Sequence, residues 1–180
     1  MLLNRNPKKC HVLTLGKFDN IRHTKRYTMY TSEIEHVFDE KDLGITIDHE
    51  LTFEDHISLK VKKANTMVGL IRRSFSYLQC DLFKKLYISF VRPHLEYAQA
   101  VWSPHLRKHI NMIENVQMRA TKLVDGFGKL DYAERLEKLD LPTLVYRRAR
   151  GDMIEIYKHF HTYDGEILPS SFQPRNRPSR

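Results

Sequence analysis

Paired histidines are the first residues in this 180-residue sequence whose spacing suggests chemistry. His105 and His109 are four positions apart, the spacing that can place two imidazoles on one helix face, as in some zinc sites. The segment lacks the glutamate of a zinc-protease motif and has no cysteine pair nearby. The seven glycines are scattered, and none has the spacing of a phosphate-binding loop. We therefore expect neither a zinc centre nor a nucleotide-binding loop.

Lysine and arginine offer a different chemistry, the binding of phosphate groups. The formal net charge is +8 and the pI is about 9.5, a balance that favours polyanionic partners such as nucleic acid. Bases dominate residues 1–31 and 60–90, whereas acids dominate residues 32–59. No acid occurs between Lys60 and Leu78. This alternation of sign predicts charged surfaces that face definite directions.

One long helix must carry part of this basic charge. From Ile57 to Leu78 apolar residues recur at intervals of three and four, which predicts a helix with one buried face. At about 100° per residue, Lys62 and Arg73 fall opposite that face, about 16 Å apart along the axis. The candidate residues for contact with a nucleic-acid backbone are Lys62, Lys63, Arg72 and Arg73. A solvated helix face is the alternative.

Short strands are expected before this helix. Their patterns cover residues 10–15, 27–30, 34–38 and 43–47. The first is expected to be buried, and in the last Leu43, Ile45 and Ile47 alternate with smaller or polar residues, as in a half-buried strand. Thr52 and Asp55 then have the spacing of a capping box at the start of the long helix.

Helices fill the rest of the chain. A second helix is expected from Asp81 to Val91, where the Arg92–Pro93 pair interrupts it or begins the next one. Further helices are expected over residues 94–101, 107–124, 132–139 and 142–160. The predicted fold class is therefore α+β, with a small antiparallel β lobe followed by a bundle of about five or six helices.

Cysteine usage and hydropathy bear on the compartment. The two cysteines, Cys10 and Cys80, have no paired spacing, which is typical of a reducing environment. No apolar run is long enough to cross a bilayer. We expect a soluble intracellular protein, nuclear or cytoplasmic, with no membrane partner.

Five strings of residues stand out from the rest of the sequence. They read NPKKCHVL (residues 6–13), EKDLGITID (40–48), FVRPHLEYA (90–98), IENVQMRATK (113–122) and YRRARGDMI (146–154). In this order they resemble the end of the reverse transcriptase of jockey-like, LINE-type (non-LTR) retrotransposons. The resemblance implies an RNA-directed DNA polymerase, a nucleotidyltransferase, of which this chain covers the last part of the palm and the helical thumb.

The same resemblance gives roles to two pairs of residues. Lys8 and Lys9 occupy the position of the palm element called motif D, where a lysine near the phosphates of the incoming nucleotide can help to protonate the leaving group. Leu43 and Gly44 stand where the primer-grip hairpin holds the primer end. The alternatives are two exposed lysines that merely precede a strand, and a bulge or strand kink at Gly44.

Metal-binding carboxylates are the missing part of the pattern. The family's polymerase holds two divalent ions, implied to be Mg²⁺, with aspartates that include an adjacent pair, and this chemistry depends on them. The sequence has no Asp-Asp dipeptide and begins just before the motif D-like string. We therefore expect Met1 to be an internal position of a longer reading frame. We also expect no catalytic residue, no bound cofactor and no polymerase activity in this chain alone.

Three segments and two functional hypotheses result. Residues 1–50 would be the end of the palm, residues 51–168 a thumb-like helical domain, and residues 169–180 a basic, proline-containing, disordered tail. The leading hypothesis is a fragment that retains template–primer binding, with the RNA template, an RNA–DNA hybrid and the missing palm and fingers as partners. The alternative is a decayed or domesticated helical protein-interaction domain with no nucleic-acid role, which would dock through Ile45, Ile47 and the apolar stripe.

Overall fold

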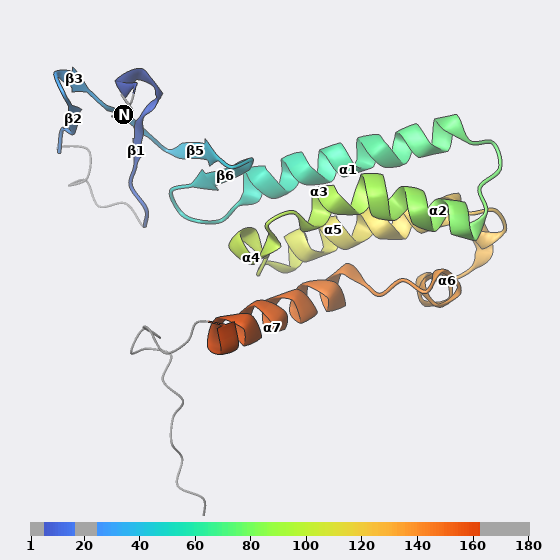
Figure 1. Cartoon of the computed structure of the whole chain (residues 1–180). Helices are drawn as coiled ribbons and strands as arrows, with labels where there is room; N and C mark the ends of the chain where they lie inside the picture. Colours follow the sequence, from blue (N-terminus) through green and yellow to red (C-terminus); the bar gives the residue numbers. More distant parts are fainter. Residues whose placement is uncertain (1–5, 17–24, 163–180) are drawn as a thin grey trace, which may run out of the picture.

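The computed structural model describes residues 6–16 and 25–162, and two parts can be distinguished in it. A small β lobe lies at one end, and a bundle of helices forms the rest of the molecule (Figure 1). The predicted α+β class is confirmed. Within the described residues, no helix combines the length and the apolar character that crossing a bilayer requires. The tail assigned to residues 169–180 lies outside the described residues.

Three two-stranded sheets make up the β lobe, which opens with the short turn η1 (Pro7–Lys9). The antiparallel pairs are β2 (Thr28–Met29) with β3 (Ser32–Glu33) and β5 (Asp39–Asp42) with β6 (Ile45–Asp48). The third pair, β1 (His11–Leu13) with β4 (Glu35–Val37), is parallel, which the long connection between the two strands permits. The expectation that residues 10–15 are a buried strand is wrong, because a two-stranded sheet leaves β1 exposed or half-buried.

The helical part begins with α1 (Glu54–Ser74), whose start differs from the prediction. Its N-cap is Phe53, in a left-handed conformation with φ of 54°, and no side chain caps it. The carboxylate of Asp48 instead accepts hydrogen bonds from the backbone N–H of Thr52 at 3.0 Å and of Phe53 at 2.6 Å. The predicted capping box of Thr52 and Asp55 is therefore wrong, because β6 leads so directly into α1 that its last residue reaches the helix entry.

The apolar stripe of α1 is covered by other parts of the same chain. Its buried members are Ile57, Val61, Ala64, Val68 and Ile71. They pack against the helices α3 and α5 described below. Because α1 ends at Ser74, Phe75 is partly exposed, and Leu78 is buried from the following loop rather than from the helix.

One almost continuous helix follows, composed of α2 (Cys80–Leu86), the π-helical segment η3 (Tyr87–Val91) and α3 (Arg92–Glu96). Pro93 lies in the first turn of α3, so the Arg92–Pro93 pair begins a new segment of this helix directly after the π-helical turn η3. The chain breaks at Tyr97 and at Ala98, which has φ of 51°, before α4 (Gln99–Trp102). The expected single helix over residues 94–101 is therefore wrong. The Trp102 indole N–H fixes the break by donating to the Tyr97 carbonyl at 2.7 Å.

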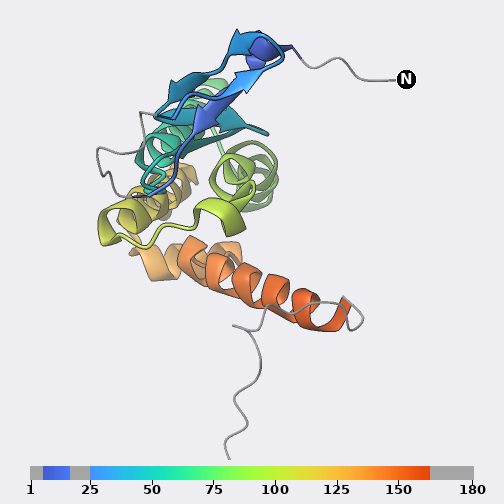
Figure 2. The ribbon, with the colours of Figure 1, turned by 90° about the vertical axis from the view of Figure 1, so that its left-hand side faces the viewer.

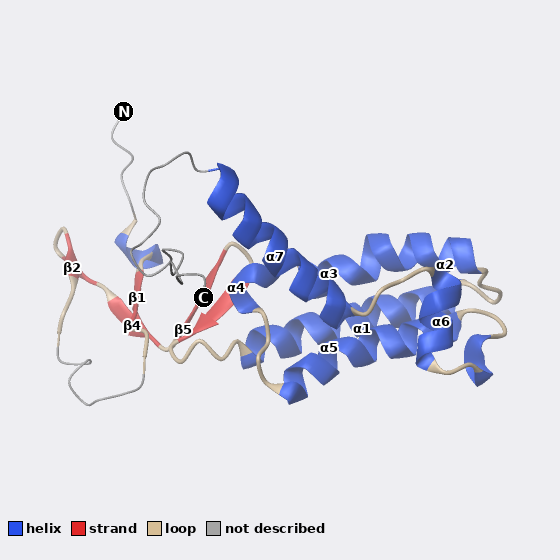
Figure 3. Cartoon of the chain, turned by 90° about the horizontal axis from the view of Figure 1, so that it is seen from below, coloured by secondary structure: helices blue, strands red, loops and turns tan. Residues whose placement is uncertain are grey.

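The remaining elements end in a helix that packs on the outside of the bundle. They are α5 (Arg107–Ala120), η4 (Thr121–Leu123), η5 (Phe127–Lys129), α6 (Tyr132–Leu139) and α7 (Leu144–Thr162). The carboxylate of Glu114, on α5, accepts hydrogen bonds from the backbone N–H of Leu144 at 3.3 Å and of Val145 at 3.2 Å, and so holds the start of α7. Figure 2 shows the β lobe above and α7 as the outermost helix, and in Figure 3 α7 crosses obliquely beneath the bundle.

The core lies between α1, the α2–α3 helix and α5. Its largest fully buried side chains are Trp102, Tyr87 and Phe83. The Tyr87 hydroxyl donates to the buried Gln117 amide oxygen at 2.6 Å, and burial raises the pKa of this phenol. The β lobe contributes Ile45 to the same core, so β6 anchors the lobe to the bundle.

Candidate nucleic-acid interface

The face of α1 opposite the core is basic and forms one wall of a hollow. Lys62 and Arg73 are exposed there, in the direction that the helical period predicted. Together with Met112 of α5, they line a hollow of about 560 Å³, called hollow A below. None of the described residues that line hollow A is acidic. α1 and α5 run side by side along the bundle (Figure 1).

A second hollow adjoins the first and adds bases from another helix. Hollow B, of about 780 Å³, is lined by Arg72 of α1 together with Arg119 near the end of α5 and Lys122 in η4. Hollows A and B share Asn65 and Gly69, and the described lining of hollow B also lacks acids. Arg72 thus lies on the flank of α1 that faces hollow B.

Arg119 and Lys122 are site residues that sequence reasoning missed. They follow Arg72 by about fifty positions and approach it only because α5 packs against α1. The available signal was their separation of three, which puts two bases near one edge of a helix. That signal could not say which other helix the edge would face.

Lys63 lies on the other flank of α1, within electrostatic range of a second group of bases. Burial lowers the pKa of the Lys60 ammonium, and the charges of Lys63 and Lys41 add to this shift. The pKa of His94, on α3, is lowered by burial first and then by Lys60 and Lys63. We call Lys41, Lys60 and Lys63 the hairpin-side cluster.

Leu43 and Gly44 form the two-residue turn of the β5–β6 hairpin, beside this cluster. Their φ angles of 46° and 81° are both positive, as a type I′ turn requires, and glycine adopts such a φ without strain. The expectation that Leu43 continues a half-buried strand is therefore wrong, and its side chain is 80% exposed. The Leu43 carbonyl accepts a hydrogen bond from the Tyr97 hydroxyl at 3.0 Å, and Lys60 Nζ lies 5.5 Å from the centre of the Tyr97 ring.

The hairpin is fastened to α1 by a buried histidine. His56 Nδ1 accepts a hydrogen bond from the backbone N–H of Thr46 at 3.1 Å, and its ring lies 5.3 Å from that of Trp102. Burial lowers the pKa of His56 to about 4, and the charge of Lys60 adds to this shift. The neutral imidazole therefore positions β6 and, through it, the turn at Leu43 and Gly44.

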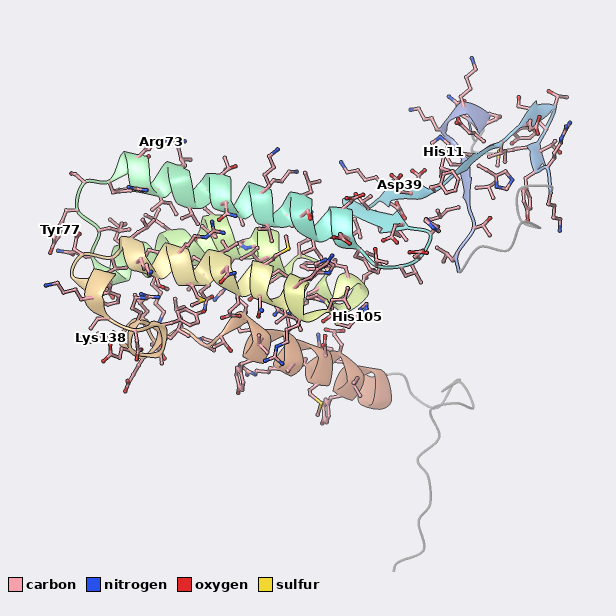
Figure 4. All side chains as sticks on the ribbon, turned by 180° about the vertical axis from the view of Figure 1, so that it is seen from behind. His11, Asp39, Arg73, Tyr77, His105 and Lys138 are labelled. Carbon is pink, nitrogen blue, oxygen red and sulfur yellow. The ribbon has the colours of Figure 1, made fainter. Side chains whose placement is uncertain are left out.

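Lys8 and Lys9 lie in the β lobe, at the other end of the molecule from Arg73. They belong to η1 in the β lobe and are exposed, and the Asn6 carboxamide oxygen accepts from the Lys8 backbone N–H at 3.1 Å. Figure 4 shows His11, which follows η1, and Arg73 at opposite ends of the molecule. The structure thus groups Lys62, Arg72 and Arg73 on one side, Leu43, Gly44 and Lys63 on another, and leaves Lys8 and Lys9 apart.

The two histidines spaced by four do not share a site. His105 is exposed and precedes α5, whereas His109 is buried within it, with Nε2 3.8 Å from a Glu54 carboxylate oxygen. Within residues 6–16 and 25–162, no group of three or more His, Cys, Asp or Glu side chains is placed to hold a metal ion. The donors that a pair of Mg²⁺ ions would need are therefore not gathered in the part of the chain that the structure describes.

The chain is similar in sequence to known proteins. Over 129 residues the chain is 30% identical to the RNA-directed DNA polymerase from the mobile element jockey of Drosophila funebris. The chain is similar to part of a mobile-element polymerase. This match covers 67% of the chain but only 13% of the polymerase.

A second relative has not been characterized. It is a protein of Caenorhabditis elegans that is 23% identical over 154 residues, which are 76% of each protein. No protein-family model matches the chain, and no solved structure matches it.

Proposed function

We propose that the chain corresponds to part of a non-LTR retrotransposon reverse transcriptase and binds template–primer duplex, an RNA–DNA hybrid, through the phosphate backbone. The observation that carries this proposal is the pair of adjoining hollows beside α1, whose described linings contain five bases and no acid. These bases are Lys62, Arg72, Arg73, Arg119 and Lys122. The similarity to the jockey polymerase supports the proposed origin.

The chemistry of these side chains favours contact with phosphates over recognition of bases. Lysine and arginine on an open helix face position a nucleic acid without reading its sequence. Lys62 and Arg73 are about 16 Å apart along α1, several times the rise of about 3.4 Å per phosphate along one strand. On the other flank, we propose that Lys63 and the turn at Leu43 and Gly44 contact the primer end.

We infer that this chain alone does not polymerise nucleotides. Two-metal catalysis requires clustered carboxylates, and the sequence has no Asp-Asp pair. The described residues contain no group of three metal-ligating side chains in the necessary positions. Lys8 and Lys9 would contact the phosphates of an incoming nucleotide only when a complete palm and fingers supply the metal site.

The test is a titration of a labelled RNA–DNA hybrid, followed by fluorescence anisotropy, with the double variant Lys62→Glu/Arg73→Glu. At about 50 mM salt the wild-type chain should bind, and the variant should lose at least about tenfold in affinity, because two attractive charges become repulsive. Circular dichroism and the melting temperature should remain those of the wild type, since both side chains are exposed.

The control variant, Lys85→Glu/Arg150→Glu, makes the same change of charge at exposed positions on α2 and α7 that line neither hollow. It should retain affinity within about threefold of the wild type, because distant exposed charges are screened. Absence of binding by the wild type at low salt, or equal losses in both variants, would show that the proposed interface is wrong.

A protein-interaction domain is the second candidate, and the outer face of α7 favours it. Met153, Ile156 and Tyr157 are exposed there by 66%, 52% and 61%. The surface first suggested for this role is covered, because Ile45 and most of the stripe from Ile57 to Leu78 are buried in the chain's own core. Under this candidate, Met153→Ser/Ile156→Ser would abolish partner binding, whereas Lys62→Glu/Arg73→Glu would leave it unchanged.

A further inference from the structure

The basic path does not stop at α5. Hollow C, of about 660 Å³, lies between the end of α5, η5 and the start of α6, and it shares Arg119 and Lys122 with hollow B. Because hollow B shares Asn65 and Gly69 with hollow A, the three hollows form one path from α1 across α5 to α6. Figure 4 shows the two outer helices of this path at the same end of the molecule, marked by Arg73 and Lys138.

A buried guanidinium lines hollow C. Arg135, on α6, is only 2% exposed. Its Nε donates to the Thr121 hydroxyl at 3.1 Å, its Nη1 to the Leu130 carbonyl at 3.0 Å and its Nη2 to the Met118 carbonyl at 3.4 Å. All three acceptors are neutral, and the Tyr132 ring, whose centre lies 5.7 Å from Cζ, adds a cation–π contact. These contacts hold the guanidinium in place, but none of them supplies a negative charge. Burying a charge without a counter-ion is costly, and an anion in the hollow offsets that cost.

Two more cations and one acid complete the charged lining of hollow C. Arg119 Nε donates to the Asn115 carbonyl at 3.2 Å, which holds this guanidinium along α5, and Lys122 is exposed. Asp131 is the one acid among the described lining residues. Its carboxylate accepts from the Glu134 backbone N–H at 2.8 Å as the cap of α6. Bases therefore outnumber acids around the hollow.

We infer that hollow C is a phosphate-binding site for the same nucleic-acid strand that contacts hollows A and B. Arg119 and Lys122 contact the phosphate directly, and Arg135 provides the buried charge behind them. The inference rests on the proposed function and adds a direction to it: the strand crosses α1 and α5 instead of following α1 alone. The two steps, from α1 to α5 and from η4 to α6, span about 20 Å at the usual spacing of packed helices, or about six nucleotides of one strand in a duplex.

Gly128 lines hollow C but not hollow B, so a substitution there changes the lining of hollow C alone. It lines hollow C, it is exposed, and a Cβ at this position would meet nothing within 4 Å. Gly128→Glu therefore places a carboxylate at the hollow, and Gly128→Ala is its uncharged control. In hybrid titrations at low salt, we expect Gly128→Glu to bind at least about fivefold more weakly than Gly128→Ala, because the added acid repels the phosphate.

A second measurement follows the buried arginine itself. The Nε–H resonance of Arg135 should shift when the hybrid is added to the Gly128→Ala variant, and should shift much less in Gly128→Glu. Equal affinities of the two Gly128 variants, together with an unmoved Arg135 resonance, would exclude hollow C from the path. If Lys62→Glu/Arg73→Glu still lost binding in that case, the proposed function would stand and only this extension would fail.

Discussion

At the scale of single residues, two nitrogen-containing side chains are buried in opposite charge states. His56 is buried as a neutral acceptor for the Thr46 N–H, whereas Arg135 is buried as a charge held by neutral oxygens. A protonated imidazole has no lone pair left at Nδ1 and cannot accept that bond. The hairpin beside α1 therefore depends on the protonation state of His56.

His56 should make the stability of the chain depend on pH in a definite direction. Its folded-state pKa of about 4 is below the unfolded value of 6.5. Its contribution is therefore complete above pH 6.5 and is lost as the pH falls toward 4, by about 3 kcal/mol in total. The measurement is the free energy of unfolding by urea at several pH values, for the wild type and for His56→Asn, which cannot titrate. Parallel pH profiles for the two proteins would contradict this assignment.

At the scale of elements, the start of α1 is organised by the strand before it. Burial alone would raise the pKa of the Asp48 carboxyl, but hydrogen bonds from the N–H groups of Thr52, Phe53 and Glu50 and from the Thr52 hydroxyl outweigh burial and lower it. The carboxylate thus joins β6 to the helix entry. Asp55, the residue that local spacing selected for capping, is exposed on the first turn of α1.

Substitutions at Asp48 and Asp55 should show which of the two carboxylates stabilises the start of α1. Asp48→Asn should destabilise the chain by about 1 kcal/mol or more, because it weakens several hydrogen bonds to a charged acceptor. Asp55→Asn should have a clearly smaller effect, since an exposed acid acts there only through the helix dipole. Chemical denaturation of both variants at pH 7 is the measurement. A larger loss of stability in Asp55→Asn than in Asp48→Asn would instead support the capping box of Thr52 and Asp55.

At the scale of the whole molecule, charge is divided between the faces of the bundle. The hollows beside α1 and α5 gather bases, while the α7 side carries ion pairs such as the contact of Arg147 Nε and Nη2 with the two carboxylate oxygens of Glu96. Positive charge is therefore concentrated on the side of the bundle formed by α1 and α5. A polyanion bound at the basic side would release its condensed counter-ions as the bases neutralise phosphates.

Salt dependence should report how many bases take part. With four or five phosphates neutralised, the logarithm of the association constant should fall against the logarithm of salt concentration with a slope of about −4. In Lys62→Glu/Arg73→Glu the slope should become shallower by about 2. Hybrid titrations between about 50 and 200 mM salt provide the measurement. A slope unchanged by the substitutions would mean that these two residues do not contact phosphates.

The sequence by itself determined the features that depend on local geometry. The helical period placed Lys62 and Arg73 opposite the buried stripe of α1, and the intervals of three and four identified that stripe, because side-chain direction along a helix follows from residue number. The α+β class followed from the same reasoning. The tertiary structure alone decided which segments meet: Arg119 beside Arg72, Asp48 at the start of α1, and Tyr97 on the hairpin turn. Local spacing fixes the directions in which side chains point, but contacts between distant segments depend on how the elements pack, which no local period encodes.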